Sequence, residues 1–145
     1  MTTVTHSILI QRPIDTVFHF VTNLENDHHW WKASIATRKL TNGSIGMGTQ
    51  FDQLSKLMGI SIHNHLHIVE WSPPASVRYS NTSKQLAYTV DYLFNEENHF
   101  TRYRLNATLE IKGILKLLMP LTMRALDKQL NSYFNNLKQY LEAAT

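Results

Sequence analysis

The chain of 145 residues contains no cysteine. Disulfide bonds, thiolate metal ligands and a cysteine nucleophile are therefore excluded. The sequence also lacks a long hydrophobic run, since no stretch approaches the roughly 18 apolar residues that span a bilayer. Its start, MTTVTHSILIQRP, alternates polar and apolar residues, whereas a secretory signal has a basic head and an unbroken apolar stretch. These absences predict a cytoplasmic protein with no integral membrane segment.

Clusters of basic residues are also missing, although the formal net charge is +3 with neutral histidines. Lysine and arginine are scattered, whereas nucleic-acid-binding chains usually concentrate them on one face or arm. Arg102 and Arg104 share a predicted strand face with Asn106 and Thr108, an arrangement typical of a solvated sheet surface. We therefore expect no nucleic-acid partner.

The length suits a single domain over residues 1–145, and a domain of this size buries about 68–70% of its unfolded surface.

The spacing of apolar residues changes once within the first 30 residues. Residues 3–10 alternate as in a strand, and Pro13 suits the first turn of a helix whose apolar positions continue to Val21. Asn23 can cap a second short helix through LENDHHWW. The chain is thus predicted to open with a strand and two short helices.

From Ser34 to Ile111 the apolar period is two. Turn residues at TNGSIGMG, SPP and NEEN divide this region into successive antiparallel strands. The predicted strands are SIATRKL, TQFDQLS, ISIHNHLHIVEW, SVRYSN, LAYTVDYLF and FTRYRLNATLEI.

The last segment returns to helical spacing. From Gly113 to Ala143 the apolar residues step by three or four, which predicts a helix of roughly 30 residues. Pro120 removes one backbone hydrogen bond, so we expect a kink or break there, with GILKLLM as a partly separate first turn or two. A seven-stranded sheet of this length should curl, and only the terminal helix can cover its concave apolar face. The pattern predicts an α+β fold.

Four stretches resemble characteristic features of a known family. RPIDTVFHFVTNLENDHHWW is similar to its strand, proline-started helix and tryptophan turn, and GSIGMGTQF to its Gly-x-Gly-Thr-x-Phe strand start. HIVEWSPPASV is similar to its Val-x-Glu-aromatic-x-Pro-Pro crossing, and LLMPLTMRALDKQLNSYFNNLKQYLEA to its final helix. The chain thus resembles the polyketide cyclase/dehydrase-type branch of the START-like (SRPBCC) superfamily over nearly its whole length. The resemblance implies a helix-grip (START/Bet v 1-like) fold with a hydrophobic cavity between sheet and helix.

His63, His65 and His67 recur at every second position and so share one strand face. Ile68 stands where the resembling proteins keep an inward valine, so alternation turns the three histidines toward water. A solvated face is the favoured interpretation, and a pH-sensitive interface or a metal site stays open. The sequence offers no evident acidic partner for their second ring nitrogens, and we expect no metal.

Aromatic residues dominate the expected cavity. Tyr79, Tyr88, Tyr92 and Tyr103 fall on inward strand positions, where they either give a ligand a few polar contacts or bond to one another in a dry core. His28 and His29, beside two tryptophans, either close the cavity mouth or form a helix end packed on the sheet. Leu117 and Leu121 are expected near the entrance. The residues predicted to contact a ligand are Trp30, Phe51, Asn64, Leu66, Tyr79, Tyr88, Tyr92, Tyr103, Leu117, Leu121, Met123 and Leu126.

No catalytic group stands out. Asp52, Glu70, Asp91 and Glu110 fall on outward positions or at strand ends, and no nucleophile lies beside a base. The favoured function is therefore binding of a hydrophobic small molecule, lipid or polyketide-like, without a cofactor. A cyclase or dehydratase acting on a polyketide-like substrate is one alternative. The other is a protein-interaction module without a ligand, using the stretch around Leu115 to Leu121, and a homodimer stays open.

Overall fold

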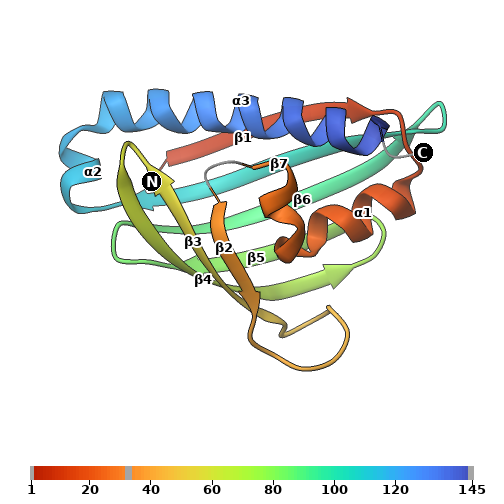
Figure 1. Cartoon of the computed structure of the whole chain (residues 1–145), viewed down its shortest axis with the longest axis horizontal. Coiled ribbons are helices and arrows are strands. Elements are labelled where there is room, and N and C mark those ends of the chain that lie inside the picture. Colours follow the sequence, from red (N-terminus) through yellow and green to blue (C-terminus); the bar gives the residue numbers. More distant parts are fainter. Residues whose placement is uncertain (1, 32–33, 144–145) are drawn as a thin grey trace.

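The computed structural model describes residues 2–31 and 34–143 of the chain. Its elements follow the predicted order of one strand, two short helices, six strands and a terminal helical segment (Figure 1). The elements are β1 (Thr2–Ile10), α1 (Ile14–Thr22), the 3-10 helix η1 (Leu24–His29), β2 (Ser34–Lys39), β3 (Gln50–Leu57), β4 (Ile60–Ser72), β5 (Ser76–Thr82), β6 (Leu86–Glu97), β7 (Phe100–Ile111), α2 (Gly113–Leu117) and α3 (Met119–Ala143). None of the helices in the described ranges combines the length and apolarity that crossing a bilayer requires.

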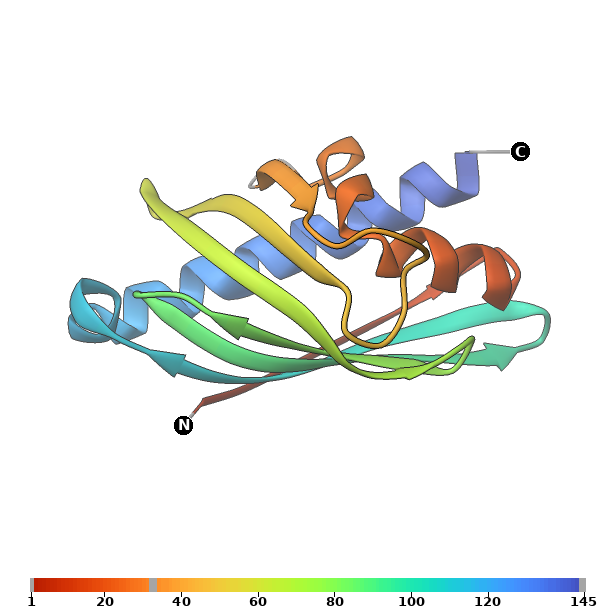
Figure 2. The same cartoon turned by 90° about the horizontal axis from the view of Figure 1, so that it is seen from below.

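The strands form one seven-stranded antiparallel sheet in the order β1-β7-β6-β5-β4-β3-β2. The strands from β2 to β7 are a meander, and β1 joins the sheet beside β7. The sheet curves, and α3 runs across its concave side (Figure 2). This is the helix-grip arrangement that the alternating pattern and the resemblance predict.

Two tight hairpins help to set the strand register. Met58 and Gly59 connect β3 to β4, and Asn98 and His99 connect β6 to β7, all four with positive φ angles between 51° and 76°. Two successive left-handed residues match the right-handed twist of the strands that they join. Asn tolerates this conformation better than most residues, which suits Asn98 to the turn.

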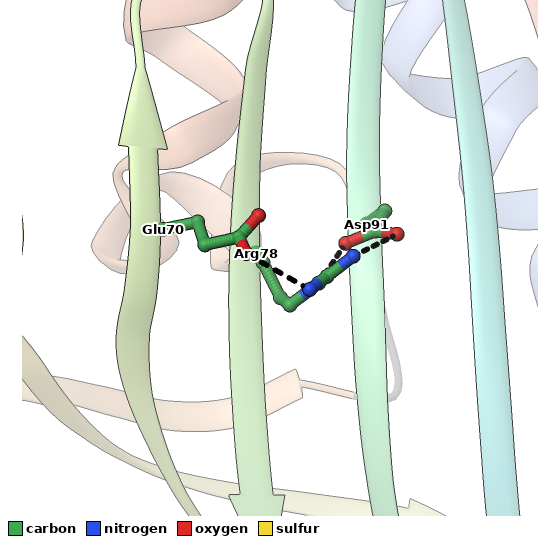
Figure 3. Close-up of polar contacts among 3 residues, drawn as sticks. All are labelled: Glu70, Arg78 and Asp91. Atoms are coloured by element: carbon green, nitrogen blue, oxygen red, sulfur yellow. Dashed lines mark hydrogen bonds and ion pairs between the residues drawn. The ribbon is translucent and has the colours of Figure 1, made fainter.

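An ion cluster on the convex face joins three neighbouring strands. Arg78 on β5 donates from Nε and Nη2 to the two carboxylate oxygens of Asp91 on β6, at 2.6 and 3.1 Å, and from Nη1 to Glu70 on β4 at 3.0 Å (Figure 3). The planar guanidinium suits this paired geometry. These groups face away from α3, so the cluster is structural and lies outside the cavity described below.

The helical segment after β7 is divided in two. α2 ends at Leu117 and α3 begins at Met119, with Pro120 in the first turn of α3, where its missing N–H costs little. The break expected near Pro120 is therefore confirmed, although it falls at Leu118. Leu115 is fully buried, and the Thr122 hydroxyl donates to its carbonyl at 2.7 Å. These two contacts hold α2 against the start of α3.

Helix α1 packs over the end of the sheet opposite to α2 (Figure 1). Phe18 of α1 lies in the core against Trp71 and Phe94, with ring centroids 5.2 Å apart in both pairs. The Asn23 side chain accepts a hydrogen bond from the Glu25 N–H, as expected for a cap. The capped segment is a 3-10 helix that ends at His29, shorter than the predicted helix through Trp31. η1 lies beside β2, the strand at one edge of the sheet.

Candidate functional site

A cavity of about 120 Å³ lies between the concave sheet face and α3. Its wall is mainly apolar and comes from β1, η1, the strands β3, β4, β6 and β7, and α3. The apolar residues on the wall are Val4, Leu24, Leu57, Ile62, Leu66, Leu86, Val90, Leu105, Ala107, Leu109, Leu126 and Leu130. The polar and aromatic ones are Asp27, Trp31, Gln53, Ser55, Lys56, Asn64, Tyr88, Tyr92, Gln129 and Tyr133.

Asp27 is the least expected of these residues. It is 2% exposed, and its Oδ2 accepts a hydrogen bond from Gln53 Nε2 at 2.7 Å. Its Oδ1 is buried without a hydrogen-bond partner among residues 2–31 and 34–143. Burial raises the pKa of the Asp27 carboxyl from 3.8 to about 8, against a smaller lowering by the Gln53 bond. The cavity therefore contains a carboxyl group that is mainly protonated at neutral pH.

Gln53 holds this carboxyl in place. It lies on an inward position of β3, and its side-chain nitrogen also donates to Thr37 Oγ1 on β2 at 3.0 Å. Both N–H groups of the amide are therefore used, one on η1 and one on β2. The arrangement fixes which Asp27 oxygen accepts a bond from the protein and which remains unpaired.

A second polar group lies on β3, β4 and β5. Asn64 Nδ2 donates to Ser55 Oγ at 3.2 Å, and Asn81 Nδ2 donates to Asn64 Oδ1 at 2.9 Å and to the Leu86 carbonyl at 3.0 Å. Asn64 and Ser55 lie on the cavity wall. The Asn64 side chain is thus bonded within the group, whereas Asn81 Oδ1 is buried without a partner in the described ranges and lies off the cavity wall.

The four predicted tyrosines all point inward, but they divide into two pairs. Tyr88 and Tyr92 lie on the cavity wall. Tyr79 and Tyr103 are fully buried behind it, where the Tyr79 hydroxyl donates to the Thr22 carbonyl and the Tyr103 hydroxyl lies 3.4 Å from that of Tyr133. Burial raises the pKa of all four phenols, which stay neutral. Tyr79 and Tyr103 therefore belong to a dry core, which was the alternative to a role as ligand contacts.

The structure places the other predicted ligand contacts as follows. Asn64, Leu66 and Leu126 lie on the cavity wall with Tyr88 and Tyr92. Phe51 is fully buried in the core behind the wall, and Met123 is partly buried against the same core. Both side chains pack in or against the core, and neither lies on the cavity wall.

Leu117 and Leu121 are clear corrections. They are 81% and 51% exposed, and neither lies on the cavity wall. The reason is that α2 turns Leu115 into the core, which leaves Leu117 on the opposite, outer side. The structure therefore places neither of these two predicted contact residues on the cavity wall.

The tryptophan prediction is also corrected. Trp31, which is half-buried, lies on the cavity wall, whereas Trp30 is buried and packs edge-on against Tyr133 with centroids 4.3 Å apart. Trp30 and Trp31 also border an outer hollow beside His28, His29 and Tyr140. The Trp31 indole thus separates the cavity from this hollow, and its Nε1 is buried without a partner in the described ranges.

The three alternating histidines lie on the outer face of β4, as predicted. His63 is exposed, and His65 and His67 are half-buried, while the residues between them are buried. The expected lack of an acidic partner is wrong for His65, whose Nδ1 lies 3.2 Å from Asp52 Oδ1 on the neighbouring β3. Within the described residues, no three His, Asp or Glu side chains are grouped to hold a metal ion.

Sequence reasoning missed Asp27, Gln53, Trp31 and Tyr133. One available signal was Gln53, because a long polar side chain on an inward strand position needs a buried partner. The partner itself was hidden in LENDHH, which has the composition of a surface turn. Its burial depends on β2 and β3 packing against η1, which local periodicity does not describe.

Comparison with solved structures supports the fold. The Thermus thermophilus protein TTHA0849 is 19% identical, with a TM-score of 0.85 over 99% of this chain and 100% of that chain. A START superfamily protein of Mycobacterium smegmatis is 12% identical, with a TM-score of 0.78 over 96% and 98%. The Zhui aromatase/cyclase of Streptomyces sp. R1128 is 9% identical, with a TM-score of 0.77 over 97% and 93%. At these identities the likeness is one of fold.

No curated protein matches the sequence. The sequence does match a family described as polyketide cyclase / dehydrase and lipid transport, over residues 1–142. This match agrees with the helix-grip topology and with the START superfamily and aromatase/cyclase structures among the neighbours. The chain belongs to the polyketide cyclase / dehydrase and lipid transport family.

Proposed function

We propose that this protein binds a mainly apolar small molecule, lipid or polyketide-like, in the cavity between the sheet and α3. The observation that carries the proposal is the composition of the cavity wall, where twelve aliphatic residues surround a few fixed polar groups. Small-molecule sites in proteins usually have this composition. The family match is consistent with such a role.

The size of the cavity limits what fits without movement. Its volume is about 120 Å³, near the roughly 150 Å³ cavity that accommodates benzene and below the roughly 300–1,000 Å³ of most ligand pockets. A one-ring molecule or the end of a longer chain therefore fits without movement. A larger ligand requires α3 or Trp31 to move away from the sheet.

Native mass spectrometry of the protein purified from its own host tests this proposal. We expect a co-purifying organic molecule in the wild type. Ala107→Phe should abolish it, because Ala107 lies on the cavity wall and a phenyl ring would fill the space. Ala87→Phe is the matched control, since Ala87 lies on the opposite face of the neighbouring strand and off the cavity wall. An empty wild-type chain, or equal loss in both variants, contradicts the proposal.

A second candidate is a cyclase or dehydratase that acts on a polyketide-like substrate. Asp27 favours it, because a buried carboxyl with a pKa of about 8 can give or take a proton near neutral pH. In this case Asp27→Asn should lower the turnover of a poly-β-ketone substrate far more than its binding. Unchanged turnover in the variant would exclude Asp27 as the proton-transfer group.

A further inference from the structure

Two residues on the cavity wall each carry a buried polar atom that has no hydrogen-bond partner in the described part of the chain. These atoms are Asp27 Oδ1 and Trp31 Nε1. Leaving a buried polar group unpaired is unfavourable, so native proteins rarely do so without a reason. Both residues come from the same short segment, and the backbone N–H of Trp31 also bonds to the carbonyl of Asp27 at 2.8 Å. The unpaired polar atoms of the cavity wall therefore belong to η1 and the residue that follows it closely.

The hydrogen-bond geometry indicates what these two atoms offer. Gln53 donates to Asp27 Oδ2, so in the neutral acid Oδ2 is the accepting carbonyl oxygen and Oδ1 carries the proton. Trp31 Nε1 is a donor in every state. Two unused donors, Oδ1–H and Nε1–H, thus belong to residues on the wall of one apolar cavity.

We propose that the Asp27 and Trp31 side chains form an anchor for an uncharged oxygen of the ligand, a ketone, aldehyde or hydroxyl group at one end of an otherwise apolar molecule. This inference rests on the proposed ligand-binding function and specifies its ligand class. A carbonyl oxygen accepts two hydrogen bonds and so can satisfy both donors. An ammonium group offers no acceptor to the indole, and a carboxylate would be repelled whenever Asp27 ionises.

The charges around the anchor agree with a neutral ligand group. Lys56 is the one basic side chain on the cavity wall among the described residues, and it is exposed. His28, next to Asp27, is also exposed, and its ring bonds to the Glu25 carbonyl. The ionisable groups that interact with Asp27 are five inward-facing phenols from β5, β6, β7 and α3: Tyr79, Tyr88, Tyr92, Tyr103 and Tyr133. All five have raised pKa values and stay neutral below pH 10, so none of these phenols adds a charge beside Asp27 near neutral pH.

Four six-membered-ring probes of similar size test the proposal on the intact protein: cyclohexanone, methylenecyclohexane, cyclohexylamine and cyclohexanecarboxylate. Binding is followed by the shifts of the indole N–H signals in NMR spectra, with Trp31 assigned by Trp31→Phe. At pH 6 we expect cyclohexanone to bind about tenfold more tightly than methylenecyclohexane, which has the same shape without the oxygen. The Trp31 indole signal should move with the ketone and not with the hydrocarbon.

Variants at Asp27 test whether its side chain acts as a hydrogen-bond donor to the ligand or has only a structural role. Asp27→Asn keeps a donor, because its amide can accept from Gln53 and donate into the cavity, so the preference for the ketone should persist. Asp27→Leu should abolish it. In the wild type the preference should fall as the pH rises through about 8, the pKa of Asp27, whereas in Asp27→Asn it should not change with pH. The wild-type pH series decides the matter even if Asp27→Leu fails to fold.

The outcomes distinguish this inference from the function on which it rests. Equal binding of ketone and hydrocarbon, as expected if a water molecule satisfies both donors, overturns the anchor but leaves an apolar binding cavity. Tighter binding of the amine or the carboxylate than of the ketone also overturns it. Failure of every probe to bind contradicts both the anchor and the proposed function.

Discussion

The Gln53 amide donates to Asp27 Oδ2 at 2.7 Å and thereby joins β3 to η1 across 26 positions of the chain. The bond lowers the pKa of the Asp27 carboxyl, whereas burial raises it by more. The contact therefore limits a shift that would otherwise be larger. It also holds the segment that carries Trp31 against the sheet, so it links the architecture to the chemistry of the cavity.

Replacing Gln53 with Leu should raise the pKa of Asp27 above about 8, because the hydrogen bond that favours the charged form is lost. The free energy of unfolding should fall by about 1–3 kcal/mol, since Asp27 and Thr37 each lose a buried partner. A carbon-13 NMR titration of the Asp27 carboxyl measures the first effect. Gln50→Leu, on an outward position of the same strand, is the control, and an unchanged Asp27 pKa in Gln53→Leu would refute the coupling.

The stability of the protein should fall with rising pH because of Asp27. The folded chain keeps the Asp27 proton up to a pH of about 8, whereas the unfolded chain loses it near 3.8. Between these values the unfolded state binds fewer protons, so this carboxyl lowers the free energy of unfolding by about 1.4 kcal/mol per pH unit. Above pH 8 both states are ionised, and the effect levels off.

Asp27→Asn isolates this contribution, because asparagine does not titrate. We expect the free energy of unfolding of the variant, minus that of the wild type, to increase steadily from pH 5 to pH 8 and then stay constant. Urea unfolding at each pH measures it. A difference that stays constant over the whole range would show that Asp27 ionises normally in the folded protein.

Much of the fold was predictable from the period of the apolar residues. The alternation from Ser34 to Ile111 predicts the six strands of the meander, and Pro120 predicts the break between α2 and α3. These features depend on neighbouring residues alone, since the side-chain period fixes which face of each strand is buried. The same alternation places Tyr79 and Tyr103 correctly on the inner face.

The cavity wall was less predictable than the inner face. Alternation indicates which side chains point inward, but it does not indicate which of these are covered by other side chains. Phe51, Tyr79 and Tyr103 were therefore predicted as ligand contacts, although they lie behind the wall. Whether Trp30 or Trp31 reaches the cavity depends on the exact end of η1. Burial of Asp27 arises from contacts distant in sequence, which no local pattern encodes.

Two leucines of α2 should respond very differently to the same substitution. Leu115→Ala should lower the free energy of unfolding by about 2–5 kcal/mol, because the side chain is fully buried. Leu117→Ala should stay within about ±0.5 kcal/mol, because that side chain is 81% exposed. Urea unfolding of both variants measures the contrast. A large loss for Leu117→Ala would mean that its side chain is covered in solution, as in a homodimer.

The outer histidines should matter little for stability. Replacing His63, His65 and His67 together with Gln should change the free energy of unfolding by about 0.5 kcal/mol or less, because all three lie on the convex face and the His65–Asp52 contact is partly solvated. Thermal unfolding with and without added zinc checks this result. Stoichiometric zinc in the wild type that is lost in the triple variant would instead identify a metal site.

The bond from the Thr122 hydroxyl to the Leu115 carbonyl joins two separate helices, so it should control the local opening of α2. In Thr122→Val the shape is kept but the bond is lost, and a buried carbonyl loses a partner. Thr22→Val is a close control, because the Thr22 hydroxyl makes a bond of the same 2.7 Å length to the Phe18 carbonyl within a single helix.

Hydrogen exchange distinguishes a local effect from a global one. We expect amides 113–119 to exchange faster in Thr122→Val than in Thr22→Val, with amides 124–138 alike in both, because only the first substitution releases α2. A short segment that opens separately could then admit a ligand too large for the cavity of about 120 Å³. Equal exchange of residues 113–119 in the two variants would mean that α2 opens only when the whole protein unfolds. Ligand entry would then have to occur elsewhere. The part of the cavity wall at Trp31 would be the next place to test.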